Sequence, residues 1–134
     1  MLSVDLTIHP CHDHVIVALR GELDIADAAD VVSALTAAAA RHREAIVDLA
    51  DLAFIDCSGA AALVRAHGRV WQADGLLLLA APRPQVRRVF MLSRLIDEVS
   101  FYASVRQAID PGEYFRVHDG LGGVPEAGGP RLRC

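Results

Sequence analysis

The sequence predicts an α/β domain in which about four helices pack on a mixed, mostly parallel sheet of four to five strands. Three observations favour this fold class. Apolar runs of strand length alternate with amphipathic stretches of helix length, the 134 residues suit one domain, and 53% of the residues are hydrophobic. Strands that alternate with helices pair in parallel through right-handed crossovers, whereas two adjacent strands at the start pair as a hairpin.

The first two elements are the strands of that hairpin. Residues 4–8 alternate apolar and polar side chains, which is typical of a strand with one buried face. Residues 15–19 are continuously apolar, which indicates a more buried strand, and residues 9–14 form the turn between the two. The segment 21–24 is expected to end the second strand, with Asp24 as the N-cap of the first helix.

Two helices and two strands follow in the middle of the chain. A helix over 26–41 and a buried strand over 45–49 lead into a loop over 50–57. A second helix is expected over 58–73, followed by a buried strand over 76–80. The apolar face of the second helix is expected to consist of Ala60, Leu63, Val64, His67 and Trp71.

The last predicted elements are short. Pro84 suits the first turn of a helix over 84–92, whose inward side chains are expected to be Val86, Val89, Phe90 and Leu92. A short strand over 99–101 precedes a helix that Ser104 caps and that ends at Ile109. Residues 110–134 hold six of the ten glycines and three of the six prolines. We therefore predict a domain over 1–109 and a flexible C-terminal tail over 110–134.

Composition excludes several classes of function. The formal net charge is −4, so the clustered positive charge that nucleic-acid binding needs is missing. All 13 basic residues are arginine, which rules out lysine-based catalysis. The three cysteines are widely spaced, so no disulfide framework is expected. Neither a signal peptide nor a membrane-spanning run is evident, and we expect a soluble cytoplasmic protein.

The segment with the strongest functional signal is residues 45–66, where a buried strand leads through a loop to Ser58 at the start of a helix. Ligand sites in such folds collect at the carboxyl ends of strands. The Ser58 hydroxyl can satisfy a free N–H of the helix start, and Gly59 leaves the first turn open to a partner. A capping serine alone would be ordinary, so the surrounding residues decide the interpretation.

Those surroundings resemble a known family. Asp48-Leu49, the segment Phe54-Ile55-Asp56-Cys57-Ser58-Gly59 and the Ala/Leu-rich helix after it are similar to the STAS domain of anti-sigma-factor antagonists. The turn Gly21-Glu22-Leu23-Asp24 is a second match, and the resemblance covers about residues 4–109. One position departs from the family pattern, because Cys57 stands where Ser or Thr often precedes the target serine.

The resemblance implies a STAS fold and a phosphorylation switch. Ser58 matches the serine that is phosphorylated by an ATP-binding kinase, which is itself the anti-sigma factor. The unphosphorylated antagonist binds this kinase and frees the sigma factor, and the phosphorylated form cannot bind. The implied partner-binding residues are Asp24, Asp56, Cys57, Ser58 and Gly59. No cofactor is implied, and a monomer or weak dimer is expected.

Three alternatives compete with the switch. Catalysis by Ser58 lacks a positioned base, because His67 lies about 13 Å further along the same predicted helix. His9, Cys11, His12 and His14 are metal-ligand types, but strand alternation sends neighbours to opposite faces, so a polar hairpin turn is favoured. The chain could also be an unphosphorylated STAS subunit of a transport system or signalling scaffold. We expect no enzymatic activity.

Overall fold

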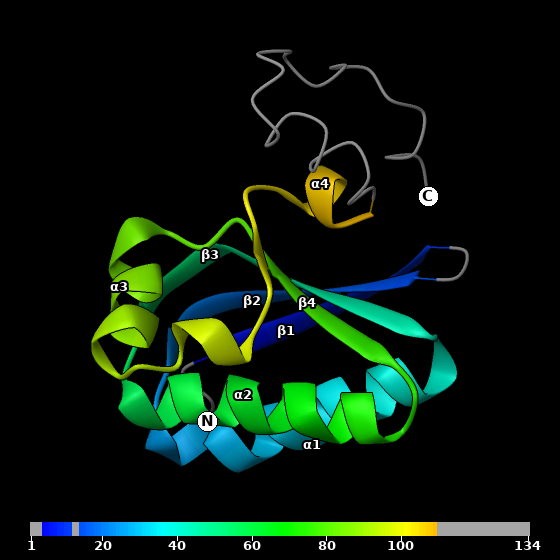
Figure 1. Cartoon of the computed structure of the whole chain (residues 1–134), viewed down its shortest axis with the longest axis horizontal. Coiled ribbons are helices and arrows are strands. Elements are labelled where there is room, and N and C mark those ends of the chain that lie inside the picture. The colour runs from blue at the N-terminus through cyan, green and yellow to red at the C-terminus, as the bar shows by residue number, and fades with distance from the viewer. Residues whose placement is uncertain (1–3, 12–13, 110–134) are drawn as a thin grey trace.

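Five strands form one sheet in the order β1-β2-β3-β4-β5, and helices pack on it (Figure 1). The computed structural model describes residues 4–11 and 14–109; the predicted C-terminal tail lies outside these ranges. β1 and β2 pair antiparallel, and every other neighbouring pair is parallel. The predicted mixed, mostly parallel sheet is confirmed. The strands are β1 Val4–Cys11, β2 His14–Leu23, β3 Glu44–Ile55, β4 Leu76–Ala80 and β5 Phe101–Tyr102.

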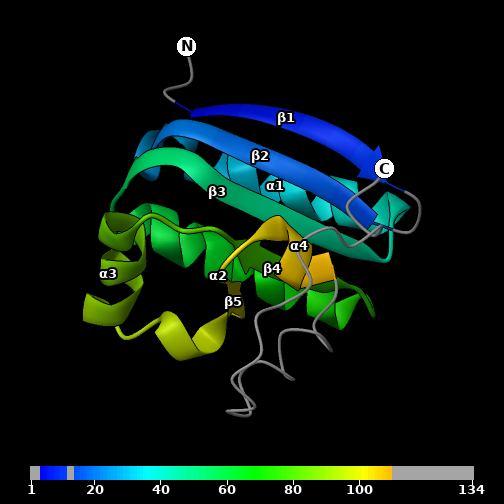
Figure 2. The same cartoon turned by 90° about the horizontal axis from the view of Figure 1, so that it is seen from above.

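In the described part of the chain, four α-helices accompany the sheet, together with one 3₁₀ turn at Ile96–Glu98. α1 and α2 lie side by side under one face, α4 lies on the other face, and α3 lies near the end of β3 (Figures 1 and 2). The helices are α1 Ile25–Arg41, α2 Cys57–Gln72, α3 Pro84–Leu92 and α4 Val105–Ile109. The helix count agrees with the prediction, and the amide of Gln107 donates to the Ser104 hydroxyl (3.1 Å), which confirms that cap.

β3 and β4 are buried on both faces over residues 45–47 and 77–80, which explains their continuous apolar runs, whereas β1 is largely exposed and β2 alternates buried and more exposed residues. In β3, Val47 belongs to the main core between the sheet and α1, α2 and α3. Its neighbour Ile46 points to the opposite face and packs with Leu78 and Ala108 in a smaller cluster under α4. Helices therefore cover both faces of the sheet. The larger core lies under α1 and α2, which begin at the carboxyl ends of β2 and β3.

β2 and β3 run further than the sequence predicts. Residues 21–24 were expected to end a strand, but β2 continues to Leu23, and the expected loop over 50–57 is strand as far as Ile55. Two register shifts and a glycine with positive φ, Gly21 (99°), bend β2 so that its end stays paired with β3. The pairs at this end are Gly21 with Leu52, Glu22 with Phe54, and Leu23 with Ile55.

Some predicted side-chain positions are wrong. Trp71 and Leu92 were expected to face inward, but both are exposed. On α2, Ala60 and Leu63 are buried as predicted, but further along the helix the buried residues are Ala66 and Val70 in place of His67 and Trp71. The last strand begins two residues later than predicted, at Phe101, and Val99 is buried before it.

The cysteines differ from one another in the part of the chain that the structure describes. Cys57 is free and exposed, whereas Cys11 is buried and disulfide-bonded. The sequence predicts no disulfide framework, and Cys11 is the one disulfide-bonded cysteine among the described residues. The thiol that bears on function is Cys57, because it precedes Ser58.

Candidate functional site

Two neighbouring strand ends bring the predicted site residues together. Leu23 and Ile55 are paired at the carboxyl ends of β2 and β3, and the amide of Asp56 donates to the carbonyl of Leu23 (3.2 Å). Asp24 and Asp56, which follow these strands directly, are therefore neighbours. α1 and α2 consequently begin at the same edge of the sheet (Figure 1). We call this surface the Ser58 edge, formed by Asp24, Asp56, Cys57, Ser58 and Gly59.

Both helices at this edge are capped by aspartate. Oδ1 of Asp24 accepts a hydrogen bond from the amide of Ala26 (3.0 Å), which confirms Asp24 as the cap of α1. Oδ1 of Asp56 accepts from the amide of Gly59 (2.8 Å) and caps α2. Each carboxylate satisfies an amide that the helix itself leaves without a partner. Each also places negative charge at the positive end of a helix dipole.

The capping role that the sequence predicts for Ser58 is therefore wrong. α2 begins at Cys57 because Asp56, in an extended conformation, already supplies the capping oxygen. Ser58 falls at the second helical position and is half-buried. Within residues 4–11 and 14–109 its hydroxyl has no hydrogen-bond partner. The Ser58 hydroxyl is thus free of intramolecular hydrogen bonds within the described residues, while the neighbouring carboxylates of Asp24 and Asp56 are held by their helix-capping bonds.

The helix cap at Asp56 gives a first testable prediction. Replacing Asp56 with alanine should lower the free energy of unfolding by about 0.5–2 kcal/mol, because the Gly59 amide loses its acceptor. Asp56→Asn should keep most of the stability, since asparagine caps as well as aspartate. Urea unfolding of both variants checks this. Equal losses in the two variants would show that charge, and not the hydrogen bond, carries the effect.

Gly59 lets α2 approach the end of β2. A Cβ at this position would lie 2.6 Å from the carbonyl oxygen of Leu23 and 2.7 Å from Cγ1 of Ile55. Real side chains do not tolerate such distances, so only glycine fits here. The sequence predicts that a partner approaches the backbone closely at Gly59. In the structure, the ends of β2 and β3 occupy this space instead. Gly59 is buried and serves the Ser58 edge by packing.

α3 is held against β3 at its first end and against the Ser58 edge at its last end. Before its first residue, Nε of Arg83 donates to the carbonyl of Ala50 on β3 (2.8 Å). After its last residue, the Ser93 hydroxyl lies 3.3 Å from Sγ of Cys57. Cys57, the departure from the family pattern, thus contacts α3 while remaining exposed. The end of α3 is therefore part of the same surface as Ser58.

Exposed apolar side chains surround the Ser58 edge, and sequence reasoning missed them. We call these four residues the apolar rim; their exposed fractions are Ile25 74%, Phe54 49%, Met91 54% and Leu92 75%. Ile25 follows the Asp24 cap, Phe54 lies two residues before Asp56, and the other two end α3. Single exposed apolar residues are normal, but a group at one edge is typical of an interaction surface.

The other candidate ligands do not gather into a site. Among the described residues, no three His, Cys, Asp or Glu side chains lie close enough to hold a metal ion; His12 lies outside that part of the chain. His14 instead pairs with Glu44, with 2.8 Å between Nδ1 and Oε1, at the opposite end of β2 from the Ser58 edge. Burial raises the pKa of Glu44, and its interactions with His14 and with the positive charge of Arg43 partly offset this.

None of the helices in residues 4–11 and 14–109 combines the length and the apolar character needed to cross a bilayer.

Comparison with known proteins places the fold. The family model of the STAS domain matches residues 4–108. The unphosphorylated form of the anti-sigma factor antagonist SpoIIAA superposes with a TM-score of 0.65 at 24% identity, covering 82% of this chain and 97% of that one. The phosphorylated form of the same Bacillus protein gives a TM-score of 0.59 at 23% identity, with 81% and 99% coverage.

Two further solved structures show how widely this fold is used. An anti-sigma factor antagonist from Mycobacterium paratuberculosis gives a TM-score of 0.71 at 21% identity, covering 81% of this chain and 93% of that one. SLC26A9 gives a TM-score of 0.66 at 12% identity, but the match covers only 21% of that much longer chain. At these identities the likeness establishes the fold, and function must be argued from the site.

Proposed function

Because the chain belongs to the STAS domain family, we propose that it is an anti-sigma-factor antagonist controlled at Ser58. In this proposal the unphosphorylated protein binds an ATP-binding anti-sigma factor, which is also a serine kinase, and so frees a sigma factor for transcription. Phosphorylation of Ser58 ends the binding. The protein acts in the cytoplasm through protein contacts, without a cofactor and without touching nucleic acid.

The observation that carries the proposal is the state of the Ser58 hydroxyl. It lies at the second position of α2 with no hydrogen-bond partner among the described residues, so phosphorylation removes no interaction of the folded domain. A phosphate would add about −1.5 to −2 charge beside Asp24 and Asp56. The start of α2 partly offsets this charge, since anions are favoured at helix N-termini by about 0.3–1 kcal/mol.

The apolar rim supports a protein partner in preference to a small substrate. Ile25, Phe54 and Leu92 offer apolar area around a polar centre, as in many protein interfaces. A partner that covers this rim excludes water from Ser58. A phosphate inside such a contact would be desolvated without a compensating positive charge, so binding would fail.

An enzymatic role has weaker support. A serine nucleophile needs a base within hydrogen-bond reach, and His67 lies on the same helix about 13 Å away, at ~1.5 Å per residue. Asp56, the acidic neighbour, is occupied by the Gly59 amide. We therefore propose binding, not turnover, as the activity of this surface.

The second candidate function is a constitutive STAS subunit of a larger assembly, such as a transport system. The likeness to part of the much longer SLC26A9 chain favours it, because the same fold there is one piece of a larger protein. Co-purification separates the two proposals. An ATP-binding anti-sigma factor as the bound protein supports the first, and a transport subunit supports the second.

The phosphorylation step is tested directly by incubating the protein with a purified anti-sigma kinase of the ATP-binding type and ATP. We expect one phosphate, mapped to Ser58 by mass spectrometry, and none in Ser58→Ala. Ser93 is the internal control, because it is a serine at the same surface whose hydroxyl is engaged with Cys57. Phosphate on Ser93 alone, or no phosphate at all, would rule out the proposed switch.

A further inference from the structure

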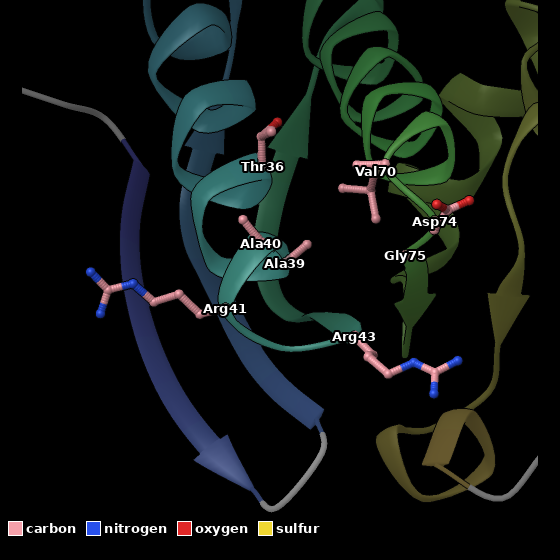
Figure 3. Close-up of a pocket in the computed structure, with 9 residues that line it drawn as sticks. Thr36, Ala39, Ala40, Arg41, Arg43, Val70, Asp74 and Gly75 are labelled. Atoms are coloured by element: carbon pink, nitrogen blue, oxygen red, sulfur yellow. The ribbon is translucent and has the colours of Figure 1, made fainter.

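A second surface lies at the opposite end of the molecule from Ser58, where α1 and α2 end and β3 and β4 begin. The amide of Leu76 donates to the carbonyl of Arg43 (3.0 Å), which joins the two strand starts. Between the helix ends lies a cavity of about 230 Å³ (Figure 3). Ala39, Val70 and Gly75 give it an apolar floor.

The size of this cavity limits what it can hold. Sites for complete small molecules usually measure about 300–1,000 Å³. A cavity of about 230 Å³ is smaller, so it suits one apolar side chain from a larger partner. A second, more open hollow of about 300 Å³ adjoins it through Asp74 and Gly75. The two together form a short track across the surface.

The adjoining hollow is bounded by large apolar side chains that the core does not use. Trp71 is 62% exposed and Leu76 is 40% exposed, and both line it. Tryptophan and arginine are the residues most enriched at the centres of protein interfaces. Nothing in the packing of the domain requires an exposed tryptophan here. Trp71 therefore marks this track as a contact surface.

The charge at the mouth of the cavity defines the kind of partner. Arg41 and Arg43 extend to either side of the opening, and Asp74 is the acidic residue of the lining (Figure 3). Arg41 ends α1, where a positive charge offsets the helix dipole. Arg43 lies beyond the helix and is exposed, so the dipole does not account for it. The mouth thus favours an acidic partner.

We propose that these two hollows form a docking surface for an acidic protein segment that inserts one apolar side chain between the ends of α1 and α2. The segment lies across Trp71 and Leu76, and its carboxylates pair with Arg41 and Arg43. This surface is separate from the Ser58 edge and does not depend on the function proposed for it. It allows the domain to hold one protein partner while Ser58 engages another.

The chain carries its own probe for the test, because Trp71 is its single tryptophan. The full chain is titrated with a capped peptide of glutamates around one central leucine, and Trp71 fluorescence is recorded. We expect a saturable change in emission that weakens with added salt. The double variant Arg41→Glu/Arg43→Glu should bind about tenfold or more weakly.

Matched controls make the outcome decisive. Arg87→Glu/Arg88→Glu changes the same charge on α3, at the other end of the molecule, and should bind as the wild type does. Leu76→Asp should lose binding while both mouth arginines remain. No saturable change with the glutamate peptide, equal losses in the two double variants, or equally tight binding of single-stranded thymidine oligonucleotide would overturn the proposal.

Discussion

Ser58→Asp is expected to weaken binding of the anti-sigma partner more than about a hundredfold while leaving the fold intact. The fold survives because a negative charge in the first turn of α2 is favoured by about 0.3–1 kcal/mol. At the interface the same charge has Asp24 and Asp56 for neighbours and no cation of its own domain within the Ser58 edge. An uncompensated charge of this kind costs about 3 kcal/mol, and each ~1.4 kcal/mol is tenfold in affinity.

Three variants isolate the effect of charge at this one position. Ser58→Ala should bind like the wild type, because it removes only a hydroxyl without a hydrogen-bond partner. Ser33→Asp adds the same charge to an exposed position of α1 and should also bind normally. Isothermal titration calorimetry gives the affinities, and thermal unfolding gives the stabilities. Tight binding by Ser58→Asp would refute the charge mechanism, as would an equal loss in Ser33→Asp.

Gly59→Ala should destabilise the protein by about 1–3 kcal/mol or more, although alanine is the better helix former. The added Cβ would lie 2.6 Å from the Leu23 carbonyl oxygen and 2.7 Å from Cγ1 of Ile55. Overpacking of a buried site costs about this much, because backbone and side chains must move apart. The intrinsic gain of ~0.5–1 kcal/mol from replacing a helical glycine cannot offset it.

The same helix supplies a matched control. Gly68 also lies in α2, but a Cβ there would meet no atom within 4 Å. Gly68→Ala should therefore stabilise the protein by about 0.5–1 kcal/mol, the ordinary helix-propensity gain. Urea unfolding of both variants measures opposite signs. Stability changes of the same sign would mean that the contact between α2 and the end of β2 is not as tight as the structure shows.

Sequence periodicity predicted the number, type and order of most elements, because the long helices bury one apolar face and the central strands β3 and β4 are continuously apolar where they are buried. The ends of β2 and β3 could not be predicted in this way. Residues 50–55 alternate too weakly to indicate a strand, and they become one because β2 lies alongside and supplies hydrogen bonds. Pairing between segments that are distant in the sequence is a tertiary effect, so the local pattern of apolar residues does not predict it.

The candidate site shows the same division. The position of Ser58 beside a strand end followed from the sequence, but its role as a cap did not hold, since Asp56 and Ser58 are both good capping residues. The choice between them depends on where β3 ends. Trp71 and Leu92 show the other gap: each large apolar side chain was predicted to be buried, and both are exposed. Whether such a side chain is exposed depends on how its helix is rotated about its own axis relative to the sheet.

The hydrogen bond between Asp56 and Leu23 has a consequence for the timing of the switch. It clamps the starts of two helices together before any partner arrives, so little conformational freedom remains to be lost on docking. In the proposed switch, such a rigid surface would store its signal in a covalent bond and not in a change of shape. The duration of the signal would then be set by the enzymes that add and remove the phosphate, and the domain itself would contribute no delay.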